Sequence, residues 1–228
     1  MTAEPSVRSA IAGLSAASSC GGAPSLEVRW IIPGRLATAV ARWFGRFPAG
    51  VESREDSYLV DPQLHGLSVK VRGDTALEVK AYRGSPGILR VAGRASGRME
   101  SWVKWSFPCA PLRQGRDDLA GWTPVRKRRR ISRFAPGSGR MVARSAAGGR
   151  EPGCQVELTE IRTPGQDWWT LGFEVTGPPG LLRSGLEAAA ALVFAEALPG
   201  GAELGLEEST SYAGWLGHGP GGADHPGA

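Results

Sequence analysis

The sequence has little of the chemistry on which many small enzymes depend. Its three cysteines, Cys20, Cys109 and Cys154, lie far apart and form no CxxC pair, and its three histidines are scattered. This spacing argues against a zinc knuckle, a dithiol redox motif and a histidine-based mechanism. Sparse cysteines without a pairing pattern predict a reduced, cytoplasmic compartment.

Several other signals are also missing. No apolar run is long enough to cross a membrane, and the segment VRSAIAGLSAASSC near the start is too rich in Ala and Ser for a signal peptide. We therefore predict no membrane partner. The chain contains no P-loop, no G-x-S-x-G and no H-E-x-x-H, so a Walker-type NTPase, a serine hydrolase of that type and a zincin are unsupported.

What the chain does have is an ordinary globular composition with a mild positive charge. Of its 228 residues, 41% are hydrophobic and 21% charged, and the net charge is +5 with a pI near 9.5. That excess favours anionic partners without choosing among phosphates, nucleic acid and membrane surfaces. The basic residues are mostly arginine, which suits bidentate contacts to phosphate or carboxylate.

Composition along the chain predicts one domain with two tails. Residues 1–24 and 217–228 are predicted to be disordered tails, and residues 136–153, rich in Gly, Ser and Arg, to be a flexible loop. Residues 25–216 then form a single domain. Within it, alternating patterns predict strands in the segments 26–32, 51–61, 65–84, 97–108, 121–136, 154–163 and 168–177, of which 65–84 is a hairpin turning at Gly73-Asp74.

Two helices flank these strands. The segment 35–47 places its apolar residues on one helical face, and the segment 186–198 follows a capping box at Ser184 and Glu187 and ends at Pro199-Gly200. The expected fold class is therefore α+β.

The polar sides of the predicted strands carry long, ionised residues of both signs. In the first strand, Glu27 and Arg29 share one face, and the opposite faces of most strands are apolar. One solvated face of an antiparallel sheet explains any single strand. If helices cover the apolar faces, however, the charged faces must meet in a common interior. A closed antiparallel barrel with a charged lumen satisfies both conditions, and a polyanion with metal ions would offset the cost of burying those charges.

The order of these segments resembles the CYTH, or triphosphate tunnel metalloenzyme, superfamily. SLEVR (25–29) is similar to its E-x-E-x-K strand, with Ser25 in place of the first Glu and Arg29 in place of Lys. EDSYLVD (55–61) resembles its D-x-Y-x-x-D segment, and LSVKVRGDTALEVK (67–80) its paired basic strands. VRKRR (125–129) resembles its second basic strand, and CQVELTEI and TLGFEV its late acidic strands, with Gly172 where a paired Glu is usual.

This resemblance implies an eight-stranded antiparallel β-tunnel with flanking helices, and metal-dependent hydrolysis of a triphosphate or related organic phosphate. It implies Mg²⁺ or Mn²⁺ as cofactor and a phosphorylated small molecule or polyphosphate as partner. The implied metal ligands are Glu27, Glu78, Glu157 and Glu174. The implied phosphate-binding residues are Arg29, Arg54, Lys70, Arg72, Lys80, Lys104, Lys127 and Arg129.

Two alternatives remain open on the sequence. The missing glutamates at 25 and 172 would weaken a two-metal site, which favours a member that binds phosphate without cleaving it. The basic run RKRRRISR (126–133) and eight tryptophans are compatible with a nucleic-acid-binding protein. Alternation splits that run, however, with Lys127 and Arg129 on one side and Arg126, Arg128 and Arg130 on the other.

Overall fold

The strands follow one another in an antiparallel plan. The computed structural model describes residues 22–64, 66–109, 121–136, 141–145, 152–163, 165–201 and 203–217. Its strands are β1 (Ala23–Pro33), β2 (Gly50–Leu59), β3 (Leu67–Arg72), β4 (Ala76–Val91), β5 (Ala95–Pro108), β6 (Trp122–Pro136), β7 (Met141–Ser145), β8 (Gly153–Thr163) and β9 (Gln166–Thr176).

Eight of these strands close into a barrel. The hydrogen-bonded order is β2-β3-β4-β5-β1-β9-β8-β6, and β6 pairs again with β2, while β7 adds to β6 outside the ring. Every pairing is antiparallel. Each of the eight strands is hydrogen-bonded to a neighbour on both sides, although β4 and β5 extend beyond their pairing with β3 and β1. The expected eight-stranded antiparallel barrel is confirmed.

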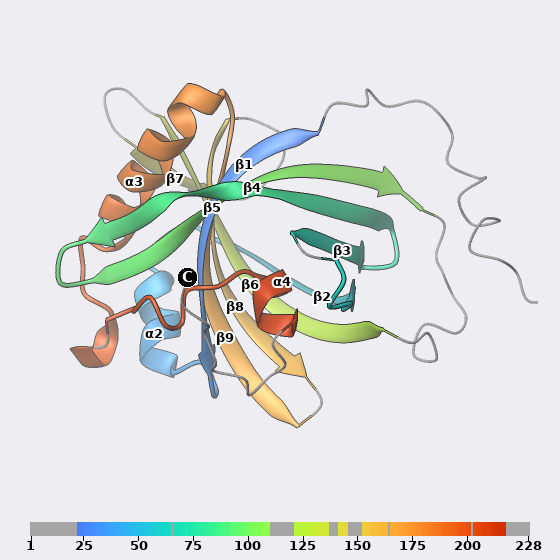
Figure 1. Cartoon of the computed structure of the whole chain (residues 1–228). Helices are drawn as coiled ribbons and strands as arrows, with labels where there is room; N and C mark the ends of the chain where they lie inside the picture. Colours follow the sequence, from blue (N-terminus) through green and yellow to red (C-terminus); the bar gives the residue numbers. More distant parts are fainter. Residues whose placement is uncertain are drawn as a thin grey trace, which may run out of the picture.

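The main apolar core lies outside the barrel rather than within it. Even-numbered residues of β1 and odd-numbered residues of β9, such as Val28, Trp30 and Phe173, pack in one cluster with the helices α2 (Thr38–Phe44) and α3 (Leu182–Val193). Figure 1 shows both helices on the same side of the sheet, at the left of the view. Since side chains alternate along a strand, covering one face with helices sends the other face into the lumen.

One end of the barrel is closed by the helix α4 (Tyr212–Gly217). Its Trp215 packs in a second apolar cluster with Ile31, Val125 and Ile161, which point inward from β1, β6 and β8. The segment before α4 follows β1, where Ile31 donates its amide to the carbonyl of Glu208. Figure 1 shows α4, in red, beside β6 and β8. The lumen therefore has an apolar floor.

Several local predictions need correction. The second helix begins at Leu182 rather than after a capping box, because the 3₁₀ turn Pro179–Leu181 leads directly into it; Ser184 instead donates to the carbonyl of Leu181. The first helix is shorter than expected. The segment predicted as a flexible loop, 136–153, contains the strand β7. The predicted hairpin turn is confirmed, with both Gly73 and Asp74 at positive φ.

None of the helices that the structure describes is long and apolar enough to cross a membrane. The predicted tails fall almost entirely outside the described residues, although β1 already begins at Ala23 and α4 includes Gly217.

Candidate functional site

The barrel encloses a charged cavity of about 330 Å³. This volume is within the range that holds a small ligand. All twelve side chains predicted to bind phosphate or metal line this one cavity, although they come from eight strands. Among the described residues the lining holds ten cationic side chains and five carboxylates: Arg29, Arg54, Lys70, Arg72, Lys80, Arg98, Lys104, Lys127, Arg129, Arg133, and Glu27, Glu78, Glu100, Glu157, Glu174.

Exposure of these side chains identifies the open end. The side chains of Arg72 and Lys104 are 45% and 31% exposed, whereas that of Lys127 is only 2% exposed. Lys127 lies next to Tyr212 of α4, at the floor. A ligand would therefore meet Arg72 and Lys104 first and Lys127 last.

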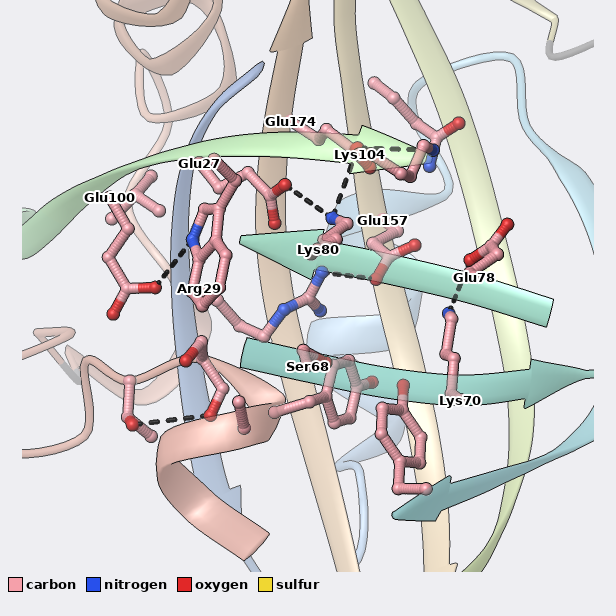
Figure 2. Close-up of a pocket in the computed structure, with 18 of the residues that line it drawn as sticks. Glu27, Arg29, Ser68, Lys70, Glu78, Lys80, Glu100, Lys104, Glu157 and Glu174 are labelled. Atoms are coloured by element: carbon pink, nitrogen blue, oxygen red, sulfur yellow. Dashed lines mark hydrogen bonds and ion pairs between the residues drawn. The ribbon is translucent and has the colours of Figure 1, made fainter. Parts of the chain in front are cut away.

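Lys80 bridges two carboxylates on neighbouring strands. Glu27 of β1 and Glu174 of β9 are directly opposite one another in the sheet. The ammonium of Lys80 lies 2.5 Å from Oε1 of Glu27 and 3.4 Å from Oε1 of Glu174 (Figure 2). Although burial opposes it, these two carboxylates raise the pKa of Lys80 above its ordinary value. Burial alone would raise the pKa of Glu174, but Lys80 and Lys104 lower it to about 2.

Arg29 occupies the space beside Gly172. A β-carbon added at Gly172 would lie 2.6 Å from Cζ of Arg29, so only glycine leaves room for the guanidinium in this position. Arg29 forms an ion pair of 2.6 Å with Glu157 and donates to Thr170 Oγ1 at 3.0 Å. Arg129 also binds Glu157. Burial disfavours the charged carboxylate, yet the two arginines hold the pKa of Glu157 well below its ordinary value.

Asp56 is the most deeply buried acid of the lumen, and its carboxylate forms ion pairs with three cationic side chains. Its carboxylate lies 2.9 Å from Arg54, 3.0 Å from Lys127 and 3.3 Å from Lys70. Burial would raise the pKa of Asp56, but these three cations lower it well below its usual range. The D-x-Y segment thus places Asp56 where it holds basic residues in position. Asp61, the last residue of that segment, is exposed and caps a turn instead.

Lys127 contacts two aromatic rings that stack on one another. Its ammonium is 4.6 Å from the ring centre of Tyr58 and 3.9 Å from that of Tyr212, and it donates to the Tyr58 hydroxyl at 2.6 Å. Such contacts favour the cation electrostatically. Burial nevertheless lowers the pKa of Lys127, and it raises the pKa of Tyr58 to about 12.

Glu100 differs from the other lumen carboxylates. It lies directly opposite Glu27 on β5 and accepts a hydrogen bond from Nε1 of Trp102 at 3.0 Å. In the part of the chain that the structure describes, no lysine or arginine lies within 4 Å of it. Burial raises the pKa of Glu100, and the nearby charge of Glu27 acts in the same direction. Figure 2 shows Glu100 apart from the ion pairs of the other acids.

The four carboxylates predicted as metal ligands do not share a metal site. Glu27 and Glu174 share Lys80, Glu157 binds Arg29 and Arg129, and Glu78 binds Lys70 at 3.2 Å. Within the described ranges, no three Asp, Glu, His or Cys side chains are grouped so that they could hold a metal ion. The arrangement present therefore does not fit a divalent ion held by several carboxylates.

Sequence reasoning missed several lining residues. Arg98 follows the same alternation as Glu100 and Lys104, and this pattern could have identified it. Arg133 continues the inward side of the basic strand, and its Nε is buried without a partner. Tyr212 lies in a short C-terminal helix with little periodicity, and its position became evident only from the closed barrel.

The basic run 126–133 is divided between two environments. Lys127 and Arg129 are buried in the lumen, as predicted, while the side chains of Arg126 and Arg128 are 79% and 57% exposed. On the outside, Arg126 pairs with Glu55 at 2.8 Å, and Arg128 and Arg130 pair with Glu160.

Comparison with known proteins gives structural matches only. No protein-family model and no curated protein matches the chain. Solved structures that match include a putative adenylyl cyclase from Hippeastrum described as having a dominant triphosphatase activity (11% identity, 84% of this chain and 94% of that chain, TM-score 0.45). Another is PH1012 from Pyrococcus horikoshii OT3, at 15% identity over 81% of this chain and 94% of that chain, with a TM-score of 0.42. A third is the S. pombe RNA triphosphatase Pct1 in complex with the Spt5 CTD, at 9% identity over 80% of this chain and 86% of that chain, with a TM-score of 0.40.

Two of these structures are described as triphosphatases, but identities of 9–15% and TM-scores of 0.40–0.45 are too low to assign this chain to their family. At these scores the matches carry no argument about activity. What the protein does must be argued from the side chains of its own barrel.

Proposed function

We propose that the barrel binds the triphosphate group of a phosphorylated small molecule, or inorganic triphosphate, and hydrolyses it in the lumen. One observation carries this proposal: among the described residues, ten cationic side chains and five carboxylates line one cavity that α4 closes at one end. A net positive cavity of about 330 Å³ that is closed at one end suits a compact polyanion.

Phosphoryl transfer depends mainly on positioning and on neutralising charge. In this proposal Lys70, Lys127 and Arg129 hold the innermost phosphate near the floor, while Arg72 and Lys104 bind the outer phosphates at the mouth. Glu100 has no cation within 4 Å among the described residues and a raised pKa, which supports a role in orienting the attacking water and accepting its proton.

A second candidate is binding without turnover. The observation that favours it is that each carboxylate predicted as a metal ligand is already engaged by lysine or arginine. The dependence on Mg²⁺ or Mn²⁺ that the family resemblance implies stays a prediction. Nucleic-acid binding is less supported, because the outward arginines Arg126, Arg128 and Arg130 are paired with carboxylates.

The test is phosphate release from inorganic triphosphate, ATP and thiamine triphosphate, each in EDTA and with Mg²⁺ or Mn²⁺. The lumen variant Arg72→Gln/Lys104→Gln is compared with the outer control Arg126→Gln/Arg128→Gln, which removes the same charge from the outside. Release that the lumen variant loses and the control keeps supports hydrolysis. Thermal stabilisation by triphosphate without release supports the binding protein. If the wild type shows neither phosphate release nor thermal stabilisation by triphosphate, the proposal is wrong.

A further inference from the structure

The lumen contains an acidic row in which carboxylates stand side by side. Glu100, Glu27 and Glu174 are direct partners across the adjacent strands β5, β1 and β9. Neighbouring carboxylates repel one another and need a cation between them. In a metal-binding barrel a divalent ion would provide that charge. Here Lys80 reaches the row from β4, with its ammonium 2.5 Å from Glu27 and 3.4 Å from Glu174.

A second resident cation lies one row deeper. The resemblance predicts a carboxylate at position 172, but this position is glycine, and the guanidinium of Arg29 fills the space that a side chain would take. Arg29 also binds Glu157 at 2.6 Å. The position of a missing acidic ligand is thus occupied by a positive group, which reverses the charge at that point.

We propose that Lys80 and Arg29 take the place of divalent metal ions in this lumen, so that the protein binds a triphosphate group without a metal. This inference rests on the proposed function, since it concerns the same cavity. Lys80 and Lys104 together balance Glu27 and Glu174, and Arg29 and Arg129 together balance Glu157 and Glu52.

Entry of a divalent ion would be unfavourable at this position. An ion bound to Glu27 and Glu174 would lie within a few ångströms of the Lys80 ammonium, where repulsion between like charges is strong in a partly buried site. Displacing Lys80 would also require another partner for a buried cation. Mg²⁺ further needs near-octahedral ligands at about 2.0–2.1 Å, which carboxylates already held by lysine and arginine do not offer.

Free cations remain for the ligand. In the portion of the chain that is described, Arg98 and Arg133 line the cavity with no carboxylate within 4 Å, and Nε of Arg133 is buried without a hydrogen-bond partner. Phosphate oxygens satisfy such donors directly. The cavity therefore already holds the positive charge that a triphosphate requires.

The inference is tested by two titrations of the whole chain, each monitored by calorimetry. The first titrates inorganic triphosphate in excess EDTA and again with Mg²⁺. The second titrates Mn²⁺ alone, also followed by electron paramagnetic resonance. We expect wild-type protein to bind triphosphate at least as tightly in EDTA as with Mg²⁺, because Mg²⁺ itself binds triphosphate and competes for it, and we expect no Mn²⁺ binding in the barrel. Triphosphate binding that requires Mg²⁺, or stoichiometric Mn²⁺ binding that Glu27→Gln abolishes, would overturn the inference.

Variants of Lys80 make the test specific. Lys80→Met removes the charge but keeps the length, and we expect it to lose about tenfold to a hundredfold in triphosphate affinity in EDTA. It should gain Mn²⁺ binding, which restores part of that affinity. Lys80→Arg keeps the charge and should show no Mn²⁺ binding. Lys104→Met, the matched charge loss at the mouth, should weaken triphosphate binding without creating a Mn²⁺ site.

The two proposals can fail separately. If neither the wild type nor any variant binds triphosphate in any buffer, the proposed function fails. The Mn²⁺ titration still shows whether Lys80 and Arg29 occupy the place of a divalent ion. If Lys80→Met does not fold, the wild type and Lys80→Arg decide the question: absence of Mn²⁺ binding in both supports the inference, and binding in either contradicts it.

Discussion

The guanidinium of Arg29 lies beside the α-carbon of Gly172, so close that a β-carbon there would be 2.6 Å from Cζ of Arg29. The two residues are direct partners in the β1–β9 ladder. Their relationship explains why an arginine at position 29 and a glycine at position 172 occur together, because the arginine needs the space that the glycine leaves. It also explains how Arg29 reaches Glu157.

This pair gives a first prediction. Gly172→Glu should displace Arg29 from its contacts with Glu157 and Thr170, and thereby lower both the melting temperature and the triphosphate affinity. The double variant Gly172→Glu/Arg29→Ala should lose less than the sum of the two single variants, because residues in contact do not act independently. Thermal unfolding of the four proteins measures this coupling. Strictly additive losses would show that the two side chains do not compete for space.

Lys127 gives a second prediction. Lys127→Met should leave Asp56 buried with fewer cations and should lower the free energy of unfolding by about 3–5 kcal/mol. The matched outer variant Arg128→Met should change it by less than about 1 kcal/mol, since its exposed ion pair is screened by water. Urea denaturation of both proteins provides the comparison. Equal losses would contradict the assignment of Lys127 to the floor of the lumen.

A third prediction concerns acid. The pKa of Glu174 in the folded protein is about 2, below its ordinary value of 4.5, so the folded state binds fewer protons than the unfolded state. The stabilisation is therefore present above pH 4.5 and is lost as the pH falls toward 2, and it amounts to about 3 kcal/mol. Wild type should exceed Glu174→Gln in stability at pH 7, and the difference should shrink between pH 4.5 and 2. A constant difference over that range would disprove the ion-pair explanation.

Glu100 behaves in the opposite way. Burial raises its pKa, so ionisation costs stability as the pH rises from 4.5 through the raised value. Glu100→Gln keeps an acceptor for Trp102 and should raise the melting temperature at pH 7, with no gain at pH 4. If Glu100 orients the attacking water, the same variant should lower phosphate release at least tenfold with little change in triphosphate affinity. A variant that is both less stable at pH 7 and fully active would contradict both roles.

The closed barrel could be predicted from the sequence because one physical pattern repeats in most strands. Charged residues alternate with apolar ones, as at Glu27, Val28 and Arg29. The two amphipathic helices must pack their apolar sides on an apolar face of the sheet. A charged lumen follows if the helices cover the apolar faces, whereas the number of strands was expected only from the family resemblance. The same alternation correctly divided Lys127 and Arg129 from their outward neighbours.

Other features could not be read from local patterns. The helix start at Leu182 depends on a 3₁₀ turn whose hydrogen bonds leave Ser184 inside the helix. The floor depends on Tyr212 and Trp215 meeting β1, β6 and β8, which are distant in sequence. The pairing of each carboxylate depends on which rows align across the barrel, and strand register is set by the fold as a whole.

The most direct test of the account is calorimetric titration of inorganic triphosphate into the wild type and into Arg72→Gln/Lys104→Gln. The account predicts one-to-one binding of triphosphate to the wild type, with an affinity that falls as salt is added. The lumen variant should bind at least about tenfold more weakly, and Arg126→Gln/Arg128→Gln should bind as the wild type does. No binding by the wild type, or equal binding by the lumen variant and the outer control, would contradict the claim that the barrel is a triphosphate site.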